Sequence, residues 1–439
     1  MTRPMAMGFA ALLLPLPSWA QDWPQFRGPD SDSLTAVSGL PDEWGPETHI
    51  AWKARVPGRG WSSPIVWGDR VFVTTAVEEQ APTTSDRRVK GGLYRWEVHC
   101  FDLESGKTLW TRVAHRGEPR IATHQGNTYA SETPVTDGRR VYAYFGMTGL
   151  FAYDFDGNLV WKKDLGAYPT EADWGTSSSP VILAHGDRLF LQIDSIEDSF
   201  LVALDTETGN EVWRVNRDEG SNWSSPIIWK NRVRTELVAN GRRVRSYDPG
   251  TGDLLWEMGI GGGRCSSSPT GDDERLYFGS EARPDGGGFL FAVKAGAAGD
   301  ITPRDGETKS AGVLWTQENA GPPMASPLVY RGLVYVLKRR TGIVTAFDAK
   351  TGEEIYKKRL KGAPGFWASP WAYDGKVFCL DATGTAHVLR AGPDFEVLGT
   401  NPLDEESWAS PALTGRGLVL RGVKHLYGIR HSTATASPR

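Results

Sequence analysis

The chain has 439 residues, and its 49 Lys and Arg residues nearly balance its 53 Asp and Glu residues, which leaves a formal net charge of −4. With no long run of one sign, this balance excludes a nucleic-acid-binding function. The 51 Gly and 18 Trp residues, in a sequence without long helical periodicity, indicate a turn-rich all-β chain.

Residues 1–20 have the features of a signal peptide. Arg3 gives a positive start, an apolar stretch runs from Met5 to Leu16, and Ser18-Trp19-Ala20 is a small-x-small cleavage site. The apolar stretch is short for a membrane span, and no Cys lies near the cleavage site to take a lipid. We therefore expect cleavage after Ala20 and export to the periplasm or the extracellular space, and we do not expect an integral membrane protein. A disordered start is the alternative interpretation.

Residues 21–48 are rich in Pro, Gly and Asp and have no strand pattern. Three aromatic residues in this segment give it apolar anchors. We therefore expect an N-terminal arm that packs across one face of the molecule through Trp23, Phe26 and Trp44.

Residues 49–56 have the pattern of a β-strand with Trp52 near its centre. The chain's end, from Pro411 to Ile429, offers three strands and lacks a fourth. The most economical interpretation is that the 49–56 strand completes the last sheet, since this closure removes two exposed sheet edges.

A Ser-Pro dipeptide, once replaced by Thr-Pro, recurs eight times between these ends. Five of the seven intervals between successive prolines lie between 41 and 46 residues. Each copy leads into a short apolar run, a polar or Gly turn and a second apolar run, which is typical of a β-hairpin. Pro suits the first residue of a strand, where its missing N–H harms no ladder bond. The copies are Ser63-Pro64, Thr133-Pro134, Ser179-Pro180, Ser225-Pro226, Ser268-Pro269, Ser326-Pro327, Ser369-Pro370 and Ser410-Pro411.

A second motif, Asp-x-x-(Thr/Ser)-Gly-x-x-x-Trp, joins the later strands of each unit. The Asp accepts backbone hydrogen bonds in the turn, the Gly takes a positive φ, and the Trp buries its ring against the neighbouring unit. Four strands in about 40–45 residues make one β-propeller blade, so the repeats predict an eight-bladed propeller with four-stranded antiparallel blades over residues 49–430. The motif spans Asp102–Trp110, Asp205–Trp213 and Asp248–Trp256, with looser copies at Asp154–Trp161 and Asp348–Tyr356. We expect Trp110, Trp161, Trp213, Trp256 and Trp315 to have this packing role.

Three insertions interrupt the repeats. A charged segment, Val77–Gly92, falls between the second and third strands of blade one, the loop Ala114–Ala130 precedes blade two, and Ala295–Gly312 lies in blade five. Because these segments lack exposed apolar anchors, we expect solvated surface and not partner contacts. Residues 431–439 are expected to form a disordered tail.

The repeated turn motif resembles the repeat of the pyrroloquinoline-quinone (PQQ) enzymes, and the resemblance covers nearly all of Trp52 to Ile429. Two functional branches share such repeats: the quinoprotein dehydrogenases, and non-catalytic eight-bladed proteins such as the outer-membrane assembly scaffold BamB. The residues that carry the resemblance are turn and packing residues. The resemblance therefore implies the fold and leaves the function open.

For a quinoprotein alcohol dehydrogenase, the resemblance implies a disulfide between adjacent cysteines against the PQQ, a calcium ion held by Glu and Asn, and an Asp base. This chain has only Cys100, Cys265 and Cys379, in separate blades, and no Cys-x-x-Cys-His haem motif. Buried free thiols are the simpler interpretation of Cys100 and Cys379. No two His residues have zinc-ligand spacing. We therefore predict no catalytic residue, metal or cofactor, with PQQ and calcium as the open alternative.

The position three residues before each Pro defines a ring near one mouth of the central channel. It holds four Trp, one Met and three Ser (Ser131, Ser177 and Ser266), so the mouth is aromatic on one arc. Such a mouth suits a flat small molecule or a peptide held by stacking and a few polar contacts; the alternative is that these Trp pack against neighbouring loops and bind nothing. The candidate ligand-binding residues are Trp61, Trp223, Met324, Trp367 and Trp408 from this ring, with Arg59, His124, Tyr129, Glu132, Asn222 and Arg264 from the same loops.

The complete set of blades and the missing redox residues favour an exported, non-catalytic binding or scaffold propeller. Its partner would be an envelope or extracellular protein, a peptide or a small ligand. The alternatives are a PQQ-dependent oxidoreductase and a carbohydrate-binding module that uses the Trp arc. The sequence leaves open whether the 21–48 arm plugs the channel.

Overall fold

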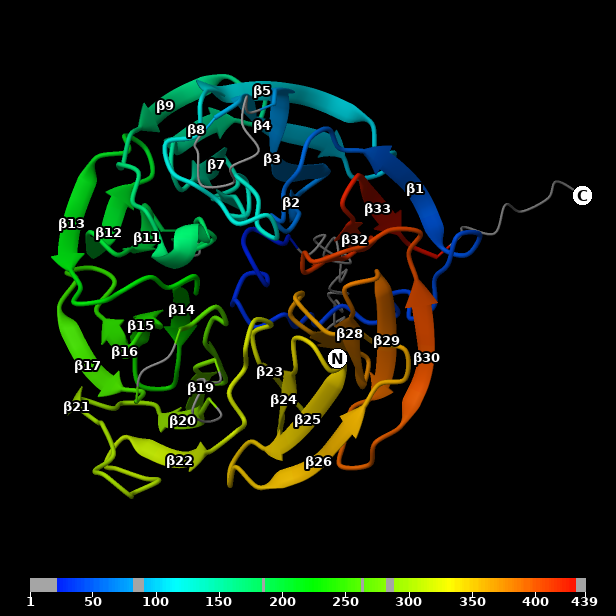
Figure 1. Cartoon of the computed structure of the whole chain (residues 1–439). Helices are drawn as coiled ribbons and strands as arrows, with labels where there is room; N and C mark the ends of the chain where they lie inside the picture. The colour runs from blue at the N-terminus through cyan, green and yellow to red at the C-terminus, as the bar shows by residue number, and fades with distance from the viewer. Residues whose placement is uncertain (1–21, 82–90, 184–185, 262–263, 282–287, 432–439) are drawn as a thin grey trace, which may run out of the picture.

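The computed structural model describes residues 22–81, 91–183, 186–261, 264–281 and 288–431. The expected signal peptide and the tail beyond His431 lie outside these residues. Within them, the strands form eight sheets arranged around one axis (Figure 1), which confirms the predicted all-β, eight-bladed propeller. The same residues include one short 3-10 helix, η1 (Glu171–Asp173), and no helix that is long and apolar enough to cross a membrane.

Each blade is a four-stranded antiparallel meander that runs from the axis outwards, and the blades are numbered one to eight in the order of their inner strands along the chain. The inner strands are β2 (Ile65–Trp67), β6 (Val135–Thr136), β10 (Val181–Ile182), β14 (Ile227–Lys230), β18 (Thr270–Gly271), β23 (Leu328–Tyr330), β27 (Trp371–Tyr373) and β31 (Ala412–Thr414). The second strands are β3 (Arg70–Gln80), β7 (Arg140–Phe145), β11 (Arg188–Asp194), β15 (Thr235–Ala239), β19 (Arg275–Gly279), β24 (Leu333–Leu337), β28 (Lys376–Leu380) and β32 (Gly417–Arg421). The third strands are β4 (Leu93–Asp102), β8 (Gly149–Asp154), β12 (Ser199–Asp205), β16 (Arg243–Tyr247), β20 (Leu290–Lys294), β25 (Ile343–Asp348), β29 (Thr385–Arg390) and β33 (His425–Ile429). The outer strands are β5 (Thr108–Gly117), β9 (Leu159–Lys163), β13 (Glu211–Asn216), β17 (Leu254–Gly259), β22 (Val313–Gln317), β26 (Glu354–Arg359), β30 (Val397–Pro402) and β1 (Ile50–Arg55).

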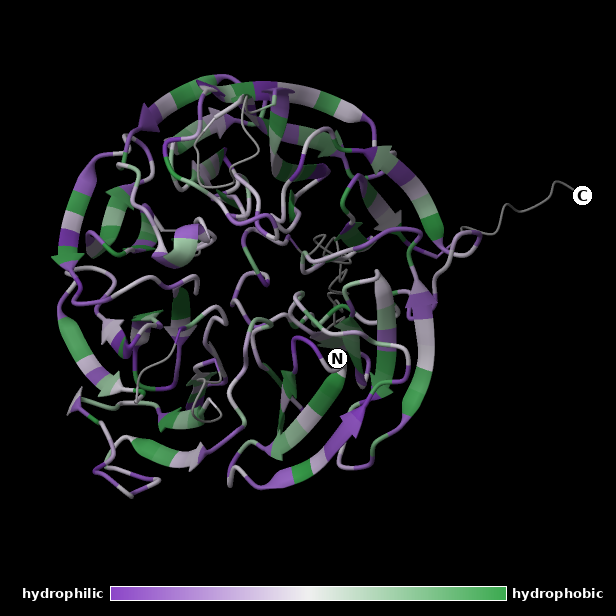
Figure 2. Cartoon of the chain, viewed as in Figure 1, coloured by the Kyte–Doolittle hydropathy of each residue, from purple (hydrophilic) through white to green (hydrophobic). Residues whose placement is uncertain are grey.

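The hydropathy of the strands follows their distance from the axis. The third strand of blade three, β12, is buried over six of its seven residues, whereas the outer strand β13 has no fully buried residue. Neighbouring blades cover both faces of the middle strands, so these strands need continuous apolar runs. The outer strands alternate between polar and apolar residues, as the striped ribbons at the rim of the ring show (Figure 2).

The first strand of the chain closes the ring, as the sequence predicts. β1 pairs antiparallel with β33, with Ala54 opposite Leu426, and so becomes the outer strand of blade eight. From there Trp52 reaches blade one, where its Nε1–H donates to the carbonyl of Leu103 at 2.9 Å. Its ring lies on Gly106, which has a φ of +68° and whose added Cβ would stand 2.5 Å from the indole.

The same staple joins four further pairs of neighbouring blades and explains the turn motif. In each case the outer-strand Trp of one blade donates its Nε1–H to the carbonyl after the turn Asp of the next blade, and packs on the turn Gly. The pairs are Trp110 with Phe155 and Gly157, Trp161 with Thr206 and Gly209, Trp213 with Pro249 and Gly252, and Trp315 with Ala349 and Gly352. The predicted packing role of these Trp residues is confirmed. Trp256 is also buried, but it donates to the Glu236 carboxylate in its own blade at 2.7 Å.

The Ser of the Ser-Pro dipeptide links the blades at the axis, a role that the sequence analysis missed. The N–H of each Ser donates to the hydroxyl of the corresponding residue in the next blade, at 2.9–3.1 Å. Seven such bonds connect Ser63 to Thr133, Thr133 to Ser179, Ser179 to Ser225, Ser225 to Ser268, Ser268 to Ser326, Ser326 to Ser369, and Ser369 to Ser410. We call these eight residues the axial hydroxyl belt. The belt makes the inner strands start at one level and so fixes where the mouth loops begin.

Removing one hydroxyl from this belt tests its contribution. Thr133→Val keeps the shape of the side chain but leaves the buried Ser63 N–H without an acceptor, so we expect the free energy of unfolding to fall by about 1–3 kcal/mol. Thr133→Ser introduces the residue found in the other blades and keeps the bond. Its loss of unfolding free energy should therefore be less than half that of Thr133→Val. Urea unfolding of both variants measures the difference, and a Val variant as stable as the Ser variant would contradict this role.

The N-terminal arm, residues 22–48, crosses the axis and bonds to the free edges of the inner strands (Figure 1). The expected packing through Trp23 and Trp44 is confirmed, since their side chains are 1% and 3% exposed, while Phe26 is half-buried. The edge bonds are those of Trp23 with Val66, Pro24 with Thr136, Gln25 with Ile182, and Ser33 with Ala372. All of these inner-strand residues follow the axial hydroxyl belt in sequence. The arm therefore covers the end of the channel opposite to the loops that precede the belt.

The arm also carries a cation into the centre of the ring. Arg27 is almost completely buried, with a positive φ of 63°, and its guanidinium donates to the carbonyl of Pro269 in blade five. Burial lowers the pKa of Arg27 to about 9, and the nearby Asp32 carboxyl opposes this shift. Arg27 therefore holds the arm against blade five, whose residues lie more than 200 positions further along the chain.

The insertion in blade five corrects one expectation. Its short strand β21 (Gly299–Asp300) pairs in parallel with the outer strand β17 of blade four, and Ile301 is only 3% exposed. The predicted solvated surface is wrong for this insertion, because Ile301 supplies an apolar anchor that composition obscured. The same expectation is wrong for the loop Ala114–Ala130, where Ile121 is 3% exposed and belongs to a hydrophobic cluster. In the third insertion, β3 continues to Gln80, while residues 82–90 lie outside the described part.

Candidate functional site at the channel mouth

The loops that precede the inner strands form the mouth opposite the arm, and three of them bring their indoles into one stack. Trp61 of blade one and Trp408 of blade eight lie with ring centroids 4.5 Å apart and 20° between planes. Trp408 and Trp367 of blade seven lie 4.8 Å apart at 15°. All three side chains are half-buried. We call them the tryptophan stack.

The stack is held by its loops. Trp61 donates its backbone N–H to Ala130 at 3.1 Å and its Nε1–H to the carbonyl of Gly126 at 3.2 Å, both in the loop before blade two. Offset stacking of parallel rings is itself favourable by about 0.5–1.5 kcal/mol per pair. Ring closure through β1 places blade eight beside blade one, so Trp61 stacks with residues more than 300 positions away in the sequence.

A second aromatic group lies in the loops of blades three and four. Trp223 packs 5.2 Å from Trp174 and donates its Nε1–H to the carbonyl of Gly175 at 2.6 Å. The Arg264 guanidinium lies 4.3 Å above the Trp174 ring and pairs with Glu171 at 2.6 Å. The sequence analysis did not predict Trp174 or Glu171 as mouth residues. Trp174 could have been selected because it is a Trp that belongs to neither repeat motif.

Glu132, one of the predicted mouth residues, is a buried acid with an exposed fraction of 1%. Its Oε1 accepts from the Thr176 hydroxyl at 2.5 Å and from the Gly146 N–H at 3.2 Å. Burial raises the pKa of Glu132 to about 7, although these two hydrogen bonds oppose the shift. Thr176 and Gly146 also line a cavity of about 20 Å³, which is room for one water molecule.

This raised pKa predicts a pH dependence of stability. The folded protein holds a proton on Glu132 that the unfolded chain releases near pH 4.5, so stability falls as pH rises from about 4.5 to about 7. Glu132→Gln keeps an acceptor for Thr176 and removes the titration. Relative to this variant, we expect the wild type to lose up to about 3 kcal/mol of unfolding free energy between pH 5 and pH 8. Parallel pH profiles in urea unfolding would contradict the assignment.

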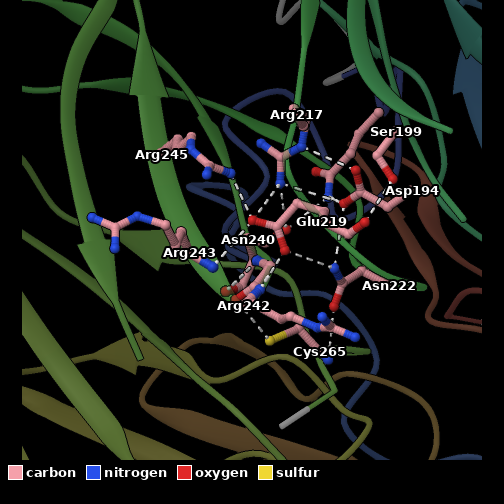
Figure 3. A network of polar contacts seen from close by, with 12 residues as sticks. Asp194, Ser199, Arg217, Glu219, Asn222, Asn240, Arg242, Arg243, Arg245 and Cys265 are labelled. Atoms are coloured by element: carbon pink, nitrogen blue, oxygen red, sulfur yellow. Dashed lines mark hydrogen bonds and ion pairs between the residues drawn. The ribbon is translucent and has the colours of Figure 1, made fainter. Parts of the chain in front are cut away.

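Asn222, another predicted mouth residue, forms hydrogen bonds within a buried polar network between blades three and four (Figure 3). Its Nδ2 donates towards Asp194 and Glu219 at 3.4 Å each, and its Oδ1 accepts from the N–H of Cys265 at 3.3 Å. Arg217, fully buried at the centre, pairs with Asp194 at 3.0 Å. Burial lowers the pKa of Arg217, but Asp194, Tyr247 and Glu219 outweigh it and raise the pKa above its usual value.

The other predicted residues lie outside both aromatic groups. His124 is exposed and its Nδ1 accepts from the N–H of Gly126 at 3.0 Å within its own loop. Tyr129 packs on Tyr94 at 5.0 Å, Arg59 is exposed, and Met324 is half-buried. Of the eleven predicted residues, the structure therefore brings Trp61, Trp367 and Trp408 into one group and Trp223 and Arg264 into a second.

The cysteines do not supply the disulfide that the resemblance implies for a PQQ site. Cys100, Cys265 and Cys379 are buried free thiols in separate blades, and burial raises all three thiol pKa values, that of Cys100 to about 12. Across the residues that the structure describes, no group of three or more His, Cys, Asp or Glu side chains could hold a metal ion. The pair of adjacent cysteines that the resemblance implies is therefore absent.

Comparison with known proteins places the chain in a family. The family model described as outer membrane protein assembly factor BamB matches residues 95–280 and 240–392, which is more than half of the chain. The chain belongs to this family. The PQQ-like resemblance is thereby confirmed.

Individual relatives agree on the fold. The solved structure of BamB from Moraxella catarrhalis superposes with a TM-score of 0.57 at 14% identity and covers 88% of this chain and 98% of that one. The quinohemoprotein alcohol dehydrogenase ADH-IIG from Pseudomonas putida gives 0.55 at 11% identity, over 95% and 82%. At these identities the likeness concerns the fold alone.

By sequence, the tetrathionate hydrolase of Acidithiobacillus ferrooxidans is 22% identical over 363 residues, which is 76% of this chain and 65% of that protein. The chain spans between 23% and 65% of the length of the curated relatives that it matches. The relatives that share sequence similarity with this chain therefore have different named activities.

Proposed function

We propose that the protein is an exported, non-catalytic scaffold propeller whose mouth binds a segment of an envelope protein. The observation that carries the proposal is the tryptophan stack, three nearly parallel indoles that are each partly exposed at the mouth. Aromatic residues are enriched at protein interfaces because they supply large contact areas at low conformational cost. The family description, an outer membrane protein assembly factor, supports an envelope partner.

The arrangement of polar groups suggests how the segment is recognised. The arm already bonds the free inner-strand edges of blades one, two, three and seven, so these edges are not free to accept a partner strand. Recognition therefore falls to side chains: an apolar or planar group on the tryptophan stack, and a polar group near the Arg264–Glu171 pair, which is 38% and 46% exposed. The partner segment would span the mouth between the two groups.

Site-specific photocrosslinking in intact cells tests this binding. A photoreactive phenylalanine analogue at position 367 should yield a defined adduct with an envelope protein, identified by mass spectrometry. The same analogue at Val212, 40% exposed on the outer strand β13, is the matched control. With Trp61→Ala added to the position-367 protein, we expect the adduct to fall at least fivefold. Equal crosslinking at both positions would overturn the proposal.

A carbohydrate ligand is the second candidate, because Trp61 and Trp367, at the two ends of the stack, each have one ring face that the stack does not cover. Glycan binding by the purified protein that is lost in Trp367→Ala and Trp223→Ala would favour it over a protein partner. Glycan binding that persists in both variants would dismiss the mouth as a sugar site.

A further inference from the structure

At several blade junctions, an aromatic side chain at the end of an inner strand covers the first hairpin of the next blade. Trp67 of blade one lies on Gly138 of blade two, where an added Cβ would stand 2.3 Å from the ring. Trp229 of blade four lies on Gly271 of blade five and donates to the carbonyl of Asp272 at 2.7 Å. Blades six and seven also end their inner strands in Tyr. These rings fill the space between neighbouring hairpins on the arm side of the propeller.

Blade five, like blades two, three and eight, has no such ring. Asp272 stands three residues after Pro269, the position that Trp67 and Trp229 occupy after their own prolines. Its carboxylate turns back to its own hairpin, where Oδ1 accepts from the N–H groups of Glu274 and Arg275 at 2.8 and 2.7 Å. In the facing hairpin of blade six, nothing lies within 4 Å of where a Cβ on Gly332 would be.

The unfilled junction is a pocket of about 400 Å³ between blades five and six, within the usual size range of small-molecule sites. Its apolar wall is made by Leu34 of the arm with Val329 and Tyr330. Three cationic residues line it against two carboxylates, and both carboxylates are already engaged: Asp348 accepts from the N–H groups of Lys350 and Thr351 in its own turn, as Asp272 does. The lining is Leu34, Asp272, Arg275, Val329, Tyr330, Arg331, Gly332, Asp348, Ala349 and Lys350.

We propose that this pocket binds a small, flat aromatic molecule that carries one anionic group. The ring would take the place that an indole fills at the blade four–five junction, and the anionic group would lie towards Lys350 and Arg331. Neither cation forms an ion pair within 4 Å among the described residues, although the Arg331 guanidinium lies beside Gly375 of blade seven and 5.6 Å from the centre of the Tyr330 ring. The pocket is on the arm side of the propeller, so this binding is independent of the mouth and of the function proposed for it.

Binding of indole-3-acetate, followed by ligand-observed NMR, tests the proposal, with uncharged 3-methylindole as the matched probe. We expect indole-3-acetate to bind at least fivefold more tightly. The double variant Lys350→Gln/Arg331→Gln should remove that preference, and Asp272→Trp, which supplies the missing ring, should weaken binding of both probes more than tenfold. Asp272→Asn, which keeps a turn acceptor, should bind like the wild type. Affinity of Asp272→Trp within twofold of the wild type, or no binding of either probe, would overturn the proposal.

Thiol protection provides a readout that does not depend on the folding of Asp272→Trp. All three native cysteines are buried, so Lys350→Cys at the exposed edge of the pocket adds the one accessible thiol among the described residues. Saturating 3-methylindole should slow its alkylation by a maleimide at least threefold, whereas a Cys introduced at the exposed Val212 should be unaffected. An alkylation rate at position 350 that the probe does not change would also overturn the proposal.

Discussion

Replacing Trp52 by Ala is expected to lower the free energy of unfolding by about 3–5 kcal/mol, the usual cost of deleting a large buried aromatic side chain. Trp52 is 9% exposed, donates to Leu103 at 2.9 Å and fills the space left open by Gly106 and Gly428, whose added Cβ atoms would stand 2.5 and 2.1 Å from its ring. Through this side chain, β1 of blade eight packs against blade one. Guanidinium unfolding followed by far-UV circular dichroism measures the loss.

A matched pair of variants separates ring closure from ordinary packing. Leu109→Ala, on the outer strand of blade one and 48% exposed, should change stability by less than about 0.5 kcal/mol. Trp213→Ala removes the same staple between blades three and four. We expect it to cost as much as Trp52→Ala in unfolding free energy but to leave blades eight and one resistant to proteolysis. A Trp52→Ala variant as stable and as resistant as Leu109→Ala would mean that Trp52 does not hold blade eight to blade one.

Removing Arg217 is expected to have a comparable effect for an electrostatic reason. Arg217→Ala would leave Asp194 buried without its bidentate partner, at 3.0 and 3.3 Å, and would take a second cation from Glu219. These side chains point toward one another (Figure 3). They are 0–1% exposed, and breaking a buried ion pair on one side costs about 3–5 kcal/mol. Arg245, 2.6 Å from Glu219, cannot reach both carboxylates in the network as it stands.

Two further variants identify the cause of the loss. Arg232→Ala breaks an exposed pair with Glu274, in which Arg232 is 60% exposed, and should cost no more than about 1 kcal/mol. The double variant Asp194→Leu/Arg217→Met replaces the pair by apolar groups and should recover most of the stability lost in Arg217→Ala. Denaturant midpoints of the four proteins measure these differences. A double variant as unstable as Arg217→Ala would show that the loss comes from packing and not from an unpaired charge.

The sequence predicted the fold because its repeats are made of residues with one local role each. The turn Gly and the outer Trp recur at a fixed spacing, and together they predict blades, their number and their mutual packing. Ring closure was predictable because the last blade lacked one strand. Residues 411–429 supply three strands, and the strand predicted at 49–56 supplies the fourth. The Ser of the Ser-Pro dipeptide was visible as a repeat, but its bond to the next blade could not be inferred, since the donor and the acceptor lie 41–70 residues apart.

The candidate site was predictable only in part. Equivalent positions before the prolines placed Trp61, Trp367 and Trp408 at one mouth, but stacking depends on loop conformations that no periodicity encodes. Asn222 sat in the right loop yet is held by a buried network whose charges come from two blades. The pocket at Asp272 was invisible in the sequence because its lining comes from two neighbouring blades and from Leu34 of the arm.

Dye-linked oxidation of alcohols and sugars by the purified protein, after incubation with PQQ and Ca²⁺, tests the central claim most directly. If the mouth is a binding surface and not a cofactor pocket, we expect no dye reduction above that of buffer and no PQQ retained after desalting. The claim would be contradicted by turnover that requires both additions and is lost in Trp408→Ala, since the cofactor would then lie on the tryptophan stack.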